Sequence, residues 1–558
     1  MNATASRPLL RERALDYARS VDWSRRPEIS TEWLILAVSL FFALACNGSF
    51  WRSAADWSGG GLGLMLSLLG VLVAVHALVL GLLAWRWNAK WLLGVLLVST
   101  ALAVHYMGRY NVYIDADMLR NVINTDRKES RELITFALLW PLLGYAVLPI
   151  VVLWRLRLRR RSVGRTLLVR AGFLIIVGLG GAAAALLSFQ DLSALMRNHH
   201  ELRYLATPIN TLAALRANLK SATPVHQHPK QPIEHDAAAT PRAAQSRPRL
   251  LLIVLGETAR AQNFGLNGYA RQTTPELAQT EGVINFPDVH SCGTSTEVSV
   301  PCMFSPFGRH DYDEDKIRGS QSLLHVLDHA GIGTLWRDNQ GGCKGVCEGL
   351  PIQRLDDAKI AGLCQDGRCM DEVLLDDLAA QVRARPGDRV VVLHQLGNHG
   401  PSYFERYPAQ YRRFTPACGN ADLGQCSRKE IVNAYDNALL YTDHFLNRAI
   451  GSLRSMPDYD TAMIYVSDHG ESLGEKGLYL HGVPYAIAPQ EQTHVPMLMW
   501  FSPEFAHDRG LDLRCVRARA AERADHDNLF PSVLGLMQVR SSVYDRSRDL
   551  FAGCEQAA

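Results

Sequence analysis

The first 290 residues of this 558-residue chain contain one cysteine, Cys46, and the residues after about 250 contain no long apolar run. The scarcity of cysteine excludes disulfide pairs from the first half, and we interpret Cys46 as a small apolar residue that fills space. Because a membrane span needs about 20 mostly apolar residues, the second half is not expected to cross a membrane. The chain also lacks internal repeats, which excludes a repeat architecture.

Long apolar runs are instead concentrated before residue 190. Five runs are long enough to cross a membrane or come close to it, and tryptophan stands at several of their ends, as is typical of the interface between lipid and water. One such run could be the core helix of a soluble protein, but five in succession predict a membrane domain. We predict a transmembrane domain over residues 1–190, with spans at about 33–51, 61–85, 91–107, 133–154 and 171–189.

The distribution of basic residues predicts the orientation of these spans. Six arginines precede the first span, and the loop after the fourth span, "RLRLRRRSVGRTLLVR", contains seven. The opposite side has Arg52 in one loop and five basic residues in 108–132, which weaken the asymmetry without reversing it. Since basic loops stay in the cytoplasm, we predict a cytoplasmic N-terminus and, after five spans, an exported C-terminal half.

Cysteine usage agrees with export of the C-terminal half. Ten of the eleven cysteines follow residue 290, mostly in close pairs, which is typical of disulfides in an oxidising compartment. Zinc clusters are the alternative, but the spacings fit no familiar zinc finger. The predicted pairs are Cys292–Cys302, Cys343–Cys347, Cys364–Cys369, Cys418–Cys426 and Cys515–Cys554.

Residues 191–249 read as a bridging segment between two domains. They begin as an amphipathic helical pattern and continue as a Pro- and Ala-rich linker. From residue 250 to 558, short apolar runs alternate with helical stretches, which predicts an α/β domain with a mostly parallel sheet covered by helices on both faces. The apolar runs are "LLLIVLGE", "GIGTLWRDN", "RVVVLHQLGNHG" and "AMIYVSDHGES".

Each of these runs ends abruptly in polar residues, and in such sheets the site lies beyond the carboxyl ends of the strands. Carboxylate and imidazole side chains that recur at one end of separate strands predict a metal site, with zinc as the default in an oxidising compartment. The candidate side chains are Glu257, His394, His399, Asp468, His469 and the following His481. A single "DH" pair could be an Asp that caps a turn beside a surface His, but the recurrence favours the metal site.

The loop "SCGTSTEVSVPC", residues 291–302, is rich in hydroxyl side chains. A Thr or Ser hydroxyl is a poor nucleophile at neutral pH, and coordination by a metal can activate it. A disulfide between Cys292 and Cys302 would hold this loop rigid. If a helix begins after Thr296, the free N–H groups of its first turn are also suited to bind phosphate.

Several long motifs closely resemble one family, the phosphoethanolamine transferases that modify lipid A. These belong to the alkaline phosphatase/sulfatase superfamily and include the mobile colistin-resistance enzymes. The resemblance covers the membrane domain and the exported domain. It is carried by "GETARAQNFGLNGYARQTTPEL", "SCGTSTEVSVPCMFS", "DNQGGCKGVC", "HQLGNHGPSYFERYP", "NAYDNALLYTD", "SDHGESLGEKGLYLHGVPYAIAP" and "EQTHVPMLMW".

The resemblance implies roles for individual residues and one tightly bound zinc, with room for a second. It makes Thr296 the nucleophile that is phosphoethanolaminated, and it makes Glu257, Asp468 and His469 ligands of the catalytic zinc together with Thr296. It assigns His399 and His481 to the substrate phosphate or to a second, more weakly held zinc, and Lys344 to a substrate contact. His394 is expected to support the site from outside, and His494 to be structural.

In residues 108–132, "NVINTDRKE" matches the lipid-facing motif of the family. Asn121, Thr125 and Glu129 are spaced four apart, so one helical face could meet the ethanolamine headgroup. A polar helix that lies on the membrane surface is the alternative interpretation of this trio.

The implied activity is transfer of phosphoethanolamine from phosphatidylethanolamine to a phosphate of lipid A, through a phosphothreonine intermediate, with resistance to polymyxin and other cationic peptides as the consequence. We expect a multi-pass protein of the bacterial inner membrane with a periplasmic catalytic domain. We also expect it to be a monomer and to have no nucleic-acid partner. The alternatives are another acceptor, such as core oligosaccharide or a periplasmic glycan, a membrane-bound phosphatase or sulfatase, and a membrane anchor without catalytic activity.

Overall fold

The computed structural model describes residues 26–555 except 126, 222–229, 235, 243–245 and 366. The arginines before residue 26, on which part of the predicted orientation rests, lie outside the described residues. The chain forms two compact units, each of two segments: Met1–His105 with Ala137–Asn210, and Tyr106–Phe136 with Thr211–Ala558. The segment between the third and fourth predicted spans therefore belongs to the same unit as the C-terminal half.

The first unit contains the apolar helices. Within the described residues, four helical segments are long and apolar enough to cross a membrane, and the bent pair α2 (Thr31–Ala45) and α3 (Gly48–Ser58) makes up to five. The four segments are α4 (Leu62–Leu83), α5 (Ala89–Tyr110), Phe136–Arg155 and α10 (Val163–Leu187). Gly181 allows α10 to approach α4 closely, because a Cβ atom on it would lie 2.6 Å from the Cβ of Ala74.

The segment Tyr106–Phe136 contributes two short helices to the second unit, α6 (Ala116–Asn124) and α7 (Arg127–Leu133). Charged contacts join them to the C-terminal half. Arg120 pairs with Glu314, and Glu132 accepts a hydrogen bond from Arg406 at 2.6 Å. These contacts explain why the segment groups with the C-terminal half and not with the helices that flank it in the sequence.

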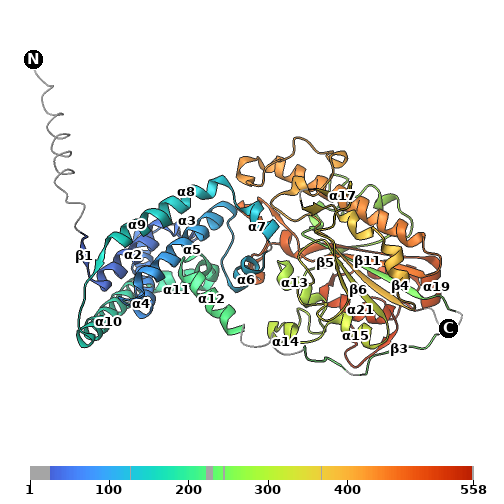
Figure 1. The fold of residues 1–558 in the computed structure, drawn as a ribbon, viewed down its shortest axis with the longest axis horizontal. Coiled ribbons are helices and arrows are strands. Elements are labelled where there is room, and N and C mark those ends of the chain that lie inside the picture. Colours follow the sequence, from blue (N-terminus) through green and yellow to red (C-terminus); the bar gives the residue numbers. More distant parts are fainter. Residues whose placement is uncertain are drawn as a thin grey trace, which may run out of the picture. The chain divides into compact units, whose positions relative to one another are not determined.

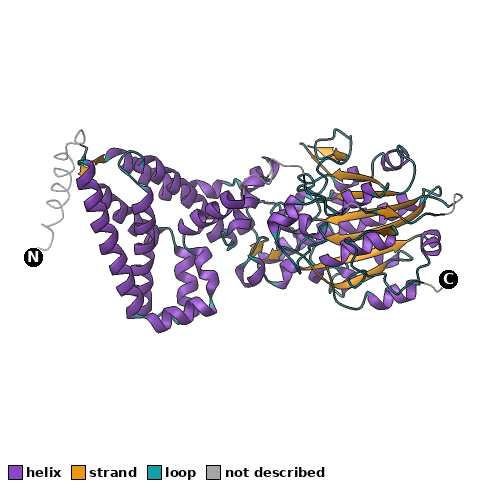
Figure 2. Cartoon of the chain, turned by 90° about the horizontal axis from the view of Figure 1, so that it is seen from below, coloured by secondary structure: helices purple, strands orange, loops and turns teal. Residues whose placement is uncertain are grey.

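An eight-stranded sheet forms the centre of the second unit (Figures 1 and 2). The sheet is mixed: β14 runs antiparallel to both of its neighbours, β11 and β5, whereas the other five strand pairings are parallel. In spatial order the strands are β15 (Ala524–Asp525), β5 (Ile284–His290), β14 (His494–Phe501), β11 (Asp460–Ser467), β4 (Arg249–Gly256), β10 (Arg389–His394), β6 (Gly333–Asp338) and β7 (Ile352–Arg354).

Helices cover both faces of this sheet. Figure 1 shows α17 (Arg428–Arg454) on one side and α15 (Leu323–His329) and α21 (Leu529–Leu536) on the other. The four predicted apolar strands are β4, β6, β10 and β11, and all four are buried along their whole length. They are adjacent and parallel in the order β11-β4-β10-β6, so their carboxyl ends meet at one edge of the sheet.

The second unit contains five disulfides, which join the ten C-terminal cysteines in the expected pairs. Four of them close short loops of between 4 and 10 residues, and Cys515–Cys554 closes a longer one. Cys46 is buried and free.

Candidate metal and phosphoryl-transfer site

Two neighbouring strands deliver three metal-ligating side chains to one point. Glu257 directly follows β4, and Asp468 and His469 directly follow β11. The register of the two strands, with Ser467 opposite Gly256, places these side chains together. His469 Nε2 lies 3.3 Å from Glu257 Oε1 and 3.4 Å from Asp468 Oδ2, and all three side chains are fully buried.

Thr296 completes this cluster as the first residue of α13 (Thr296–Met303). Its hydroxyl donates to Glu257 Oε2 at 3.0 Å and lies 3.3 Å from His469 Nε2. The free N–H groups of the first turn of α13 add a site suited to an anion beside the hydroxyl. The hydroxyl of the predicted nucleophile thus contacts two of the three predicted ligands, and the third, Asp468, lies 3.4 Å from His469.

The donor atoms of the cluster are those that a bound cation requires. Within the described residues, Glu257 Oε1 and Asp468 Oδ2 are buried and have no hydrogen-bond partner. The Nδ1 of His469 is 2.9 Å from the carbonyl of Gly470, so Nδ1–H donates there and Nε2 is the ring nitrogen that faces the two carboxylates. Buried oxygen and imidazole lone pairs at this spacing fit zinc.

The raised pKa values of Asp468 and His469 also indicate that the cluster requires positive charge. Burial and the charge of Glu257 raise the pKa of Asp468 to about 6. Burial acts to lower the pKa of His469, but the charges of Asp468 and Glu257 outweigh it and raise that pKa to about 10. Two carboxylates without water are unstable side by side, so a cation between them stabilises the folded site.

His399 and His481 lie next to this cluster. The ring of His481 is 4.4 Å from that of His469 and 5.5 Å from that of His399, measured between centroids. The Nδ1 of His481 is 2.8 Å from a carboxylate oxygen of Glu471, which orients its ring. Burial lowers the pKa of His399 to about 3, so its imidazole is neutral and able to bind a metal or accept a hydrogen bond.

The segment Tyr106–Phe136 reaches the same site. Glu129 Oε1 accepts a hydrogen bond from Gln340 at 3.2 Å and lies 3.5 Å from His399 Nε2. The trio of Asn121, Thr125 and Glu129 does not share one continuous helix, because α6 ends at Asn124 and Glu129 belongs to α7. The hydroxyl of Thr125 donates to the carbonyl of Asn121 at 2.6 Å and so helps to end α6.

Three other predicted residues lie around the site. Lys344 Nζ is 3.4 Å from Glu297 Oε1, on the residue that follows Thr296. His394 is fully buried, and its Nδ1 is 2.8 Å from Asp338 Oδ1, consistent with a supporting role. His494 Nε2 donates to the carbonyl of Pro287 at 2.8 Å, as expected of a structural residue.

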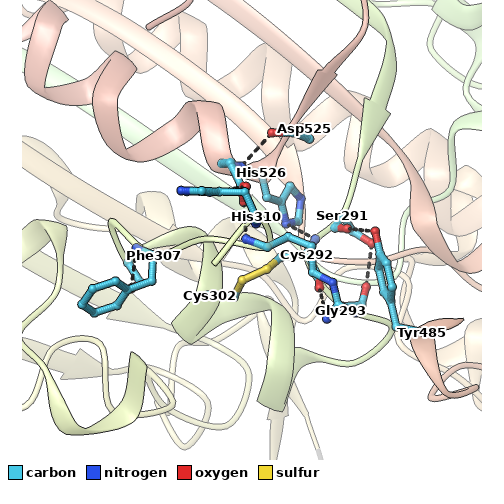
Figure 3. Close-up of a disulfide and its surroundings, with 12 residues drawn as sticks. Ser291, Cys292, Gly293, Cys302, Phe307, His310, Tyr485, Asp525 and His526 are labelled. Atoms are coloured by element: carbon cyan, nitrogen blue, oxygen red, sulfur yellow. Dashed lines mark hydrogen bonds and ion pairs between the residues drawn. A yellow bond between two sulfur atoms is a disulfide. The ribbon is translucent and has the colours of Figure 1, made fainter. Parts of the chain in front are cut away.

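His526 is a site residue that the sequence motifs do not reveal (Figure 3). Its Nδ1 accepts the backbone N–H of Cys292 at 3.0 Å, so its Nε2–H donates to the carbonyl of Ser467, also at 3.0 Å. Cys292 begins the disulfide-closed loop that carries Thr296, and Ser467 precedes Asp468. The neutral imidazole therefore fixes the position of this loop relative to the end of β11. No motif links these residues, since 234 positions separate Cys292 from His526.

The two hydrogen bonds of His526 predict the effects of two substitutions at this position. A Gln side chain has one acceptor and two donors, so His526→Gln can retain both contacts and much of the activity. His526→Leu leaves a buried N–H and a buried C=O without partners, at a cost of about 1–3 kcal/mol each in unfolding free energy. We expect a loss of about tenfold or more in kcat with Leu, because a small misplacement of a nucleophile is costly. Equal activity of the Leu and Gln variants would contradict this positioning role.

Comparison with known proteins places this fold and site in a class. The sulfatase family model matches residues 249–539, which span the sheet and the metal cluster, so the second unit contains a sulfatase-like domain. A second family model, described as phosphoethanolamine transferase EptA/EptB, matches residues 72–223. The chain belongs to the phosphoethanolamine transferase family, and the resemblance noted in the sequence is confirmed.

Similar proteins support this assignment over nearly the whole chain. Phosphoethanolamine transferase EptA of Escherichia coli K12 is 36% identical over 543 residues, which cover 96% of this chain and 99% of that protein. Phosphatidylethanolamine transferase Mcr-1 of Escherichia coli is also 36% identical, covering 94% of this chain and 98% of that protein. The structure of lipooligosaccharide phosphoethanolamine transferase A from Neisseria meningitidis, an integral membrane protein, matches with a TM-score of 0.91 and 36% identity, over 95% of this chain and 100% of that one.

Proposed function

We propose that this protein transfers phosphoethanolamine from phosphatidylethanolamine to a phosphate of lipid A. The observation that carries the proposal is the position of Thr296, whose hydroxyl contacts both Glu257 and His469 at the start of a helix. A phosphoryl group on this hydroxyl would meet the N–H groups of the helix and the imidazoles of His399 and His481. The family membership supports the nature of the transferred group.

Glu257, Asp468 and His469, together with the oxygen of Thr296, would hold one zinc. Bound zinc would favour ionisation of the threonine hydroxyl and neutralise charge that develops on the phosphoryl oxygens. His399 and His481 would bind the substrate phosphate or a second zinc, and Lys344 would contact the substrate. Asn121, Thr125 and Glu129 would meet the ethanolamine headgroup, where the carboxylate of Glu129 suits an ammonium group.

The reaction consists of two in-line displacements. In the first, Thr296 Oγ1 forms a bond to the phosphorus of the donor, the bond from phosphorus to the diacylglycerol oxygen breaks, and that oxygen takes up the proton which Thr296 gives up. In the second, a phosphate oxygen of lipid A forms a bond to the same phosphorus. The bond to Thr296 Oγ1 breaks, its electron pair returns to the threonine oxygen, and that oxygen takes up the proton that the attacking phosphate hydroxyl gives up. The protein contributes mainly positioning and electrostatic stabilisation.

The membrane helices and the disulfides support a proposal for the cellular setting. We propose that the protein is a monomer of the bacterial inner membrane, with a cytoplasmic N-terminus and a periplasmic sulfatase-like domain. Phosphoethanolamine adds a positive amine to an anionic lipid. Cationic peptides such as polymyxins would therefore bind the modified membrane more weakly.

Mass spectrometry of lipid A tests the proposed function. Bacteria that express the wild-type chain should contain lipid A with added phosphoethanolamine and should survive higher polymyxin concentrations than cells without it. The core oligosaccharide of the same cells serves as the internal control for acceptor choice. Modification of the core sugars with unmodified lipid A would overturn the proposed acceptor, and release of free phosphoethanolamine alone would indicate a hydrolase.

A further inference from the structure

A separate cavity of about 380 Å³ opens beside the nucleophile helix within the second unit. Glu297 and Pro301 of α13 form one wall, and Arg318 of α14 (Glu314–Gly319) forms another. The loop that carries Lys344 and the extended residue Lys230 complete it. None of Glu129, His399 and His481 lines this cavity, so it is distinct from the histidine side of the site.

Three cationic side chains converge on the cavity. Glu297 Oε1 lies 3.4 Å from Lys344 Nζ, and Glu297 Oε2 lies 3.4 Å from Arg318. The carboxylate of Glu297 also accepts a hydrogen bond from Asn124 at 3.1 Å and is therefore already neutralised. Glu348 is the other acidic residue in the lining, so basic groups are in excess.

Lys230 differs from Arg318 and Lys344, the other two cations of this lining, because it forms no ion pair with Glu297. Its Nζ donates to the carbonyls of Arg318 at 3.0 Å and Ser320 at 3.2 Å, and the structure shows no ion pair between Lys230 and any described carboxylate. A Cβ atom on Gly345 would lie 3.7 Å from this Nζ, so Lys230 stands against the loop that carries Lys344. One of its three N–H groups remains for a ligand.

The loop that carries Lys344 is held in a fixed conformation. The φ angle of Lys344 is +48°, in the left-handed region that residues other than glycine seldom adopt. The disulfide Cys343–Cys347 encloses this residue. The lining also includes the polar side chains of Ser305, Ser322 and Gln321. The buried Oε1 of Gln321 has no hydrogen-bond partner among the described residues.

We propose that this cavity binds the phosphorylated sugar of the acceptor, with Lys230 as an anchor for its negative charge. The excess of basic groups disfavours the ammonium group of the donor headgroup and favours a phosphate. The polar lining suits sugar hydroxyls and excludes acyl chains. The cavity adjoins the residue that follows Thr296, so a sugar held there stays beside the loaded threonine. This inference deepens the proposed function and rests on it.

The two half-reactions of the purified full-length protein, in detergent with zinc, separate donor binding from acceptor binding. Loading is followed as release of diacylglycerol from fluorescent phosphatidylethanolamine without acceptor, and transfer is started by adding lipid A. Lys230→Gln keeps a hydrogen-bond donor and removes the charge. We expect its KM for lipid A to rise about tenfold, as for the loss of one charged hydrogen bond, while loading changes by less than about twofold.

Two further variants make this result specific. Lys230→Arg retains the charge and should recover most of the affinity for lipid A. Lys316→Gln removes a lysine that is about half exposed on α14 and does not line the cavity, and it should behave as wild type. An unchanged KM in Lys230→Gln, or a loss of loading as large as the loss of transfer, would overturn the inference. Failure of the wild type to load, or to pass its group to lipid A, would instead overturn the proposed function.

Discussion

Replacement of Thr296 by alanine is expected to abolish the transfer of phosphoethanolamine, with a fall in rate of about four orders of magnitude or more, as for the loss of other catalytic nucleophiles. The hydroxyl of Thr296 is the one that contacts Glu257 and His469, and the variant has no oxygen there to receive the phosphoryl group. The methyl group of alanine fits the space, so the protein should fold. Mass spectrometry of lipid A, and of the intact protein after incubation with donor, measures both steps.

Thr294 provides the matched control for this substitution. It lies two residues earlier in the same loop and is similarly buried, but its hydroxyl donates to the carbonyl of Val483 at 2.7 Å, away from the metal ligands. Thr294→Ala should lose some stability and retain loading of the protein. Modified lipid A in cells that express only Thr296→Ala would refute the assignment of the nucleophile.

Asp468→Asn is expected to remove the stabilisation of the fold by zinc. For the wild type, zinc at about 1,000 times its dissociation constant should add about 4 kcal/mol to the free energy of unfolding. The Asn variant retains the oxygen that accepts from the backbone N–H groups of Thr258 and His469 but replaces the unpaired oxygen by an amide. In the presence of a chelator it should be at least as stable as the wild type, because one buried charge is gone.

Thermal unfolding with zinc and with chelator, together with the measured zinc content, tests this expectation. Asp443→Asn is the matched control, since Asp443 is a buried aspartate that accepts from the backbone N–H groups of Glu276 and Leu277, away from the cluster. It should lose stability equally in both conditions and keep the zinc-dependent shift. An Asp468→Asn variant that binds zinc as the wild type does would show that the cluster is not the metal site.

The metal cluster could be predicted from the sequence because its signals are local. A continuous apolar run that ends in a charged residue marks both the strand and its carboxyl end, and Glu257 and Asp468 each follow such a run. Parallel pairing of β4 and β11 then brings the two ends together. The direction of β14 carried no such signal, since an apolar strand buried on both faces has the same pattern whether it runs parallel or antiparallel.

Other parts of the site depend on contacts between segments that are distant in the sequence. His526 supports the site because its ring contacts two backbone groups, the N–H of Cys292 in the loop after β5 and the carbonyl of Ser467 at the end of β11. Both residues are distant from His526 in the sequence. The grouping of Tyr106–Phe136 with the C-terminal half depends on pairs such as Arg120–Glu314 and Glu132–Arg406. The spacing of four residues also suggested one polar helical face, but α6 ends before Thr125, so no such continuous face forms.

The second unit is built from two separate segments of the chain, and this affects what a fragment of the protein contains. Because the chain leaves the first unit at His105, returns at Ala137 and leaves again at Asn210, cleavage in the linker after residue 221 would not release the second unit whole. A fragment that begins after this point would keep Thr296 and its proposed metal ligands but lose Glu129, the neighbour of His399, and Asn124, the partner of Glu297. Measurements on such a fragment would therefore report the proposed metal site but underestimate the proposed binding of the lipid headgroup.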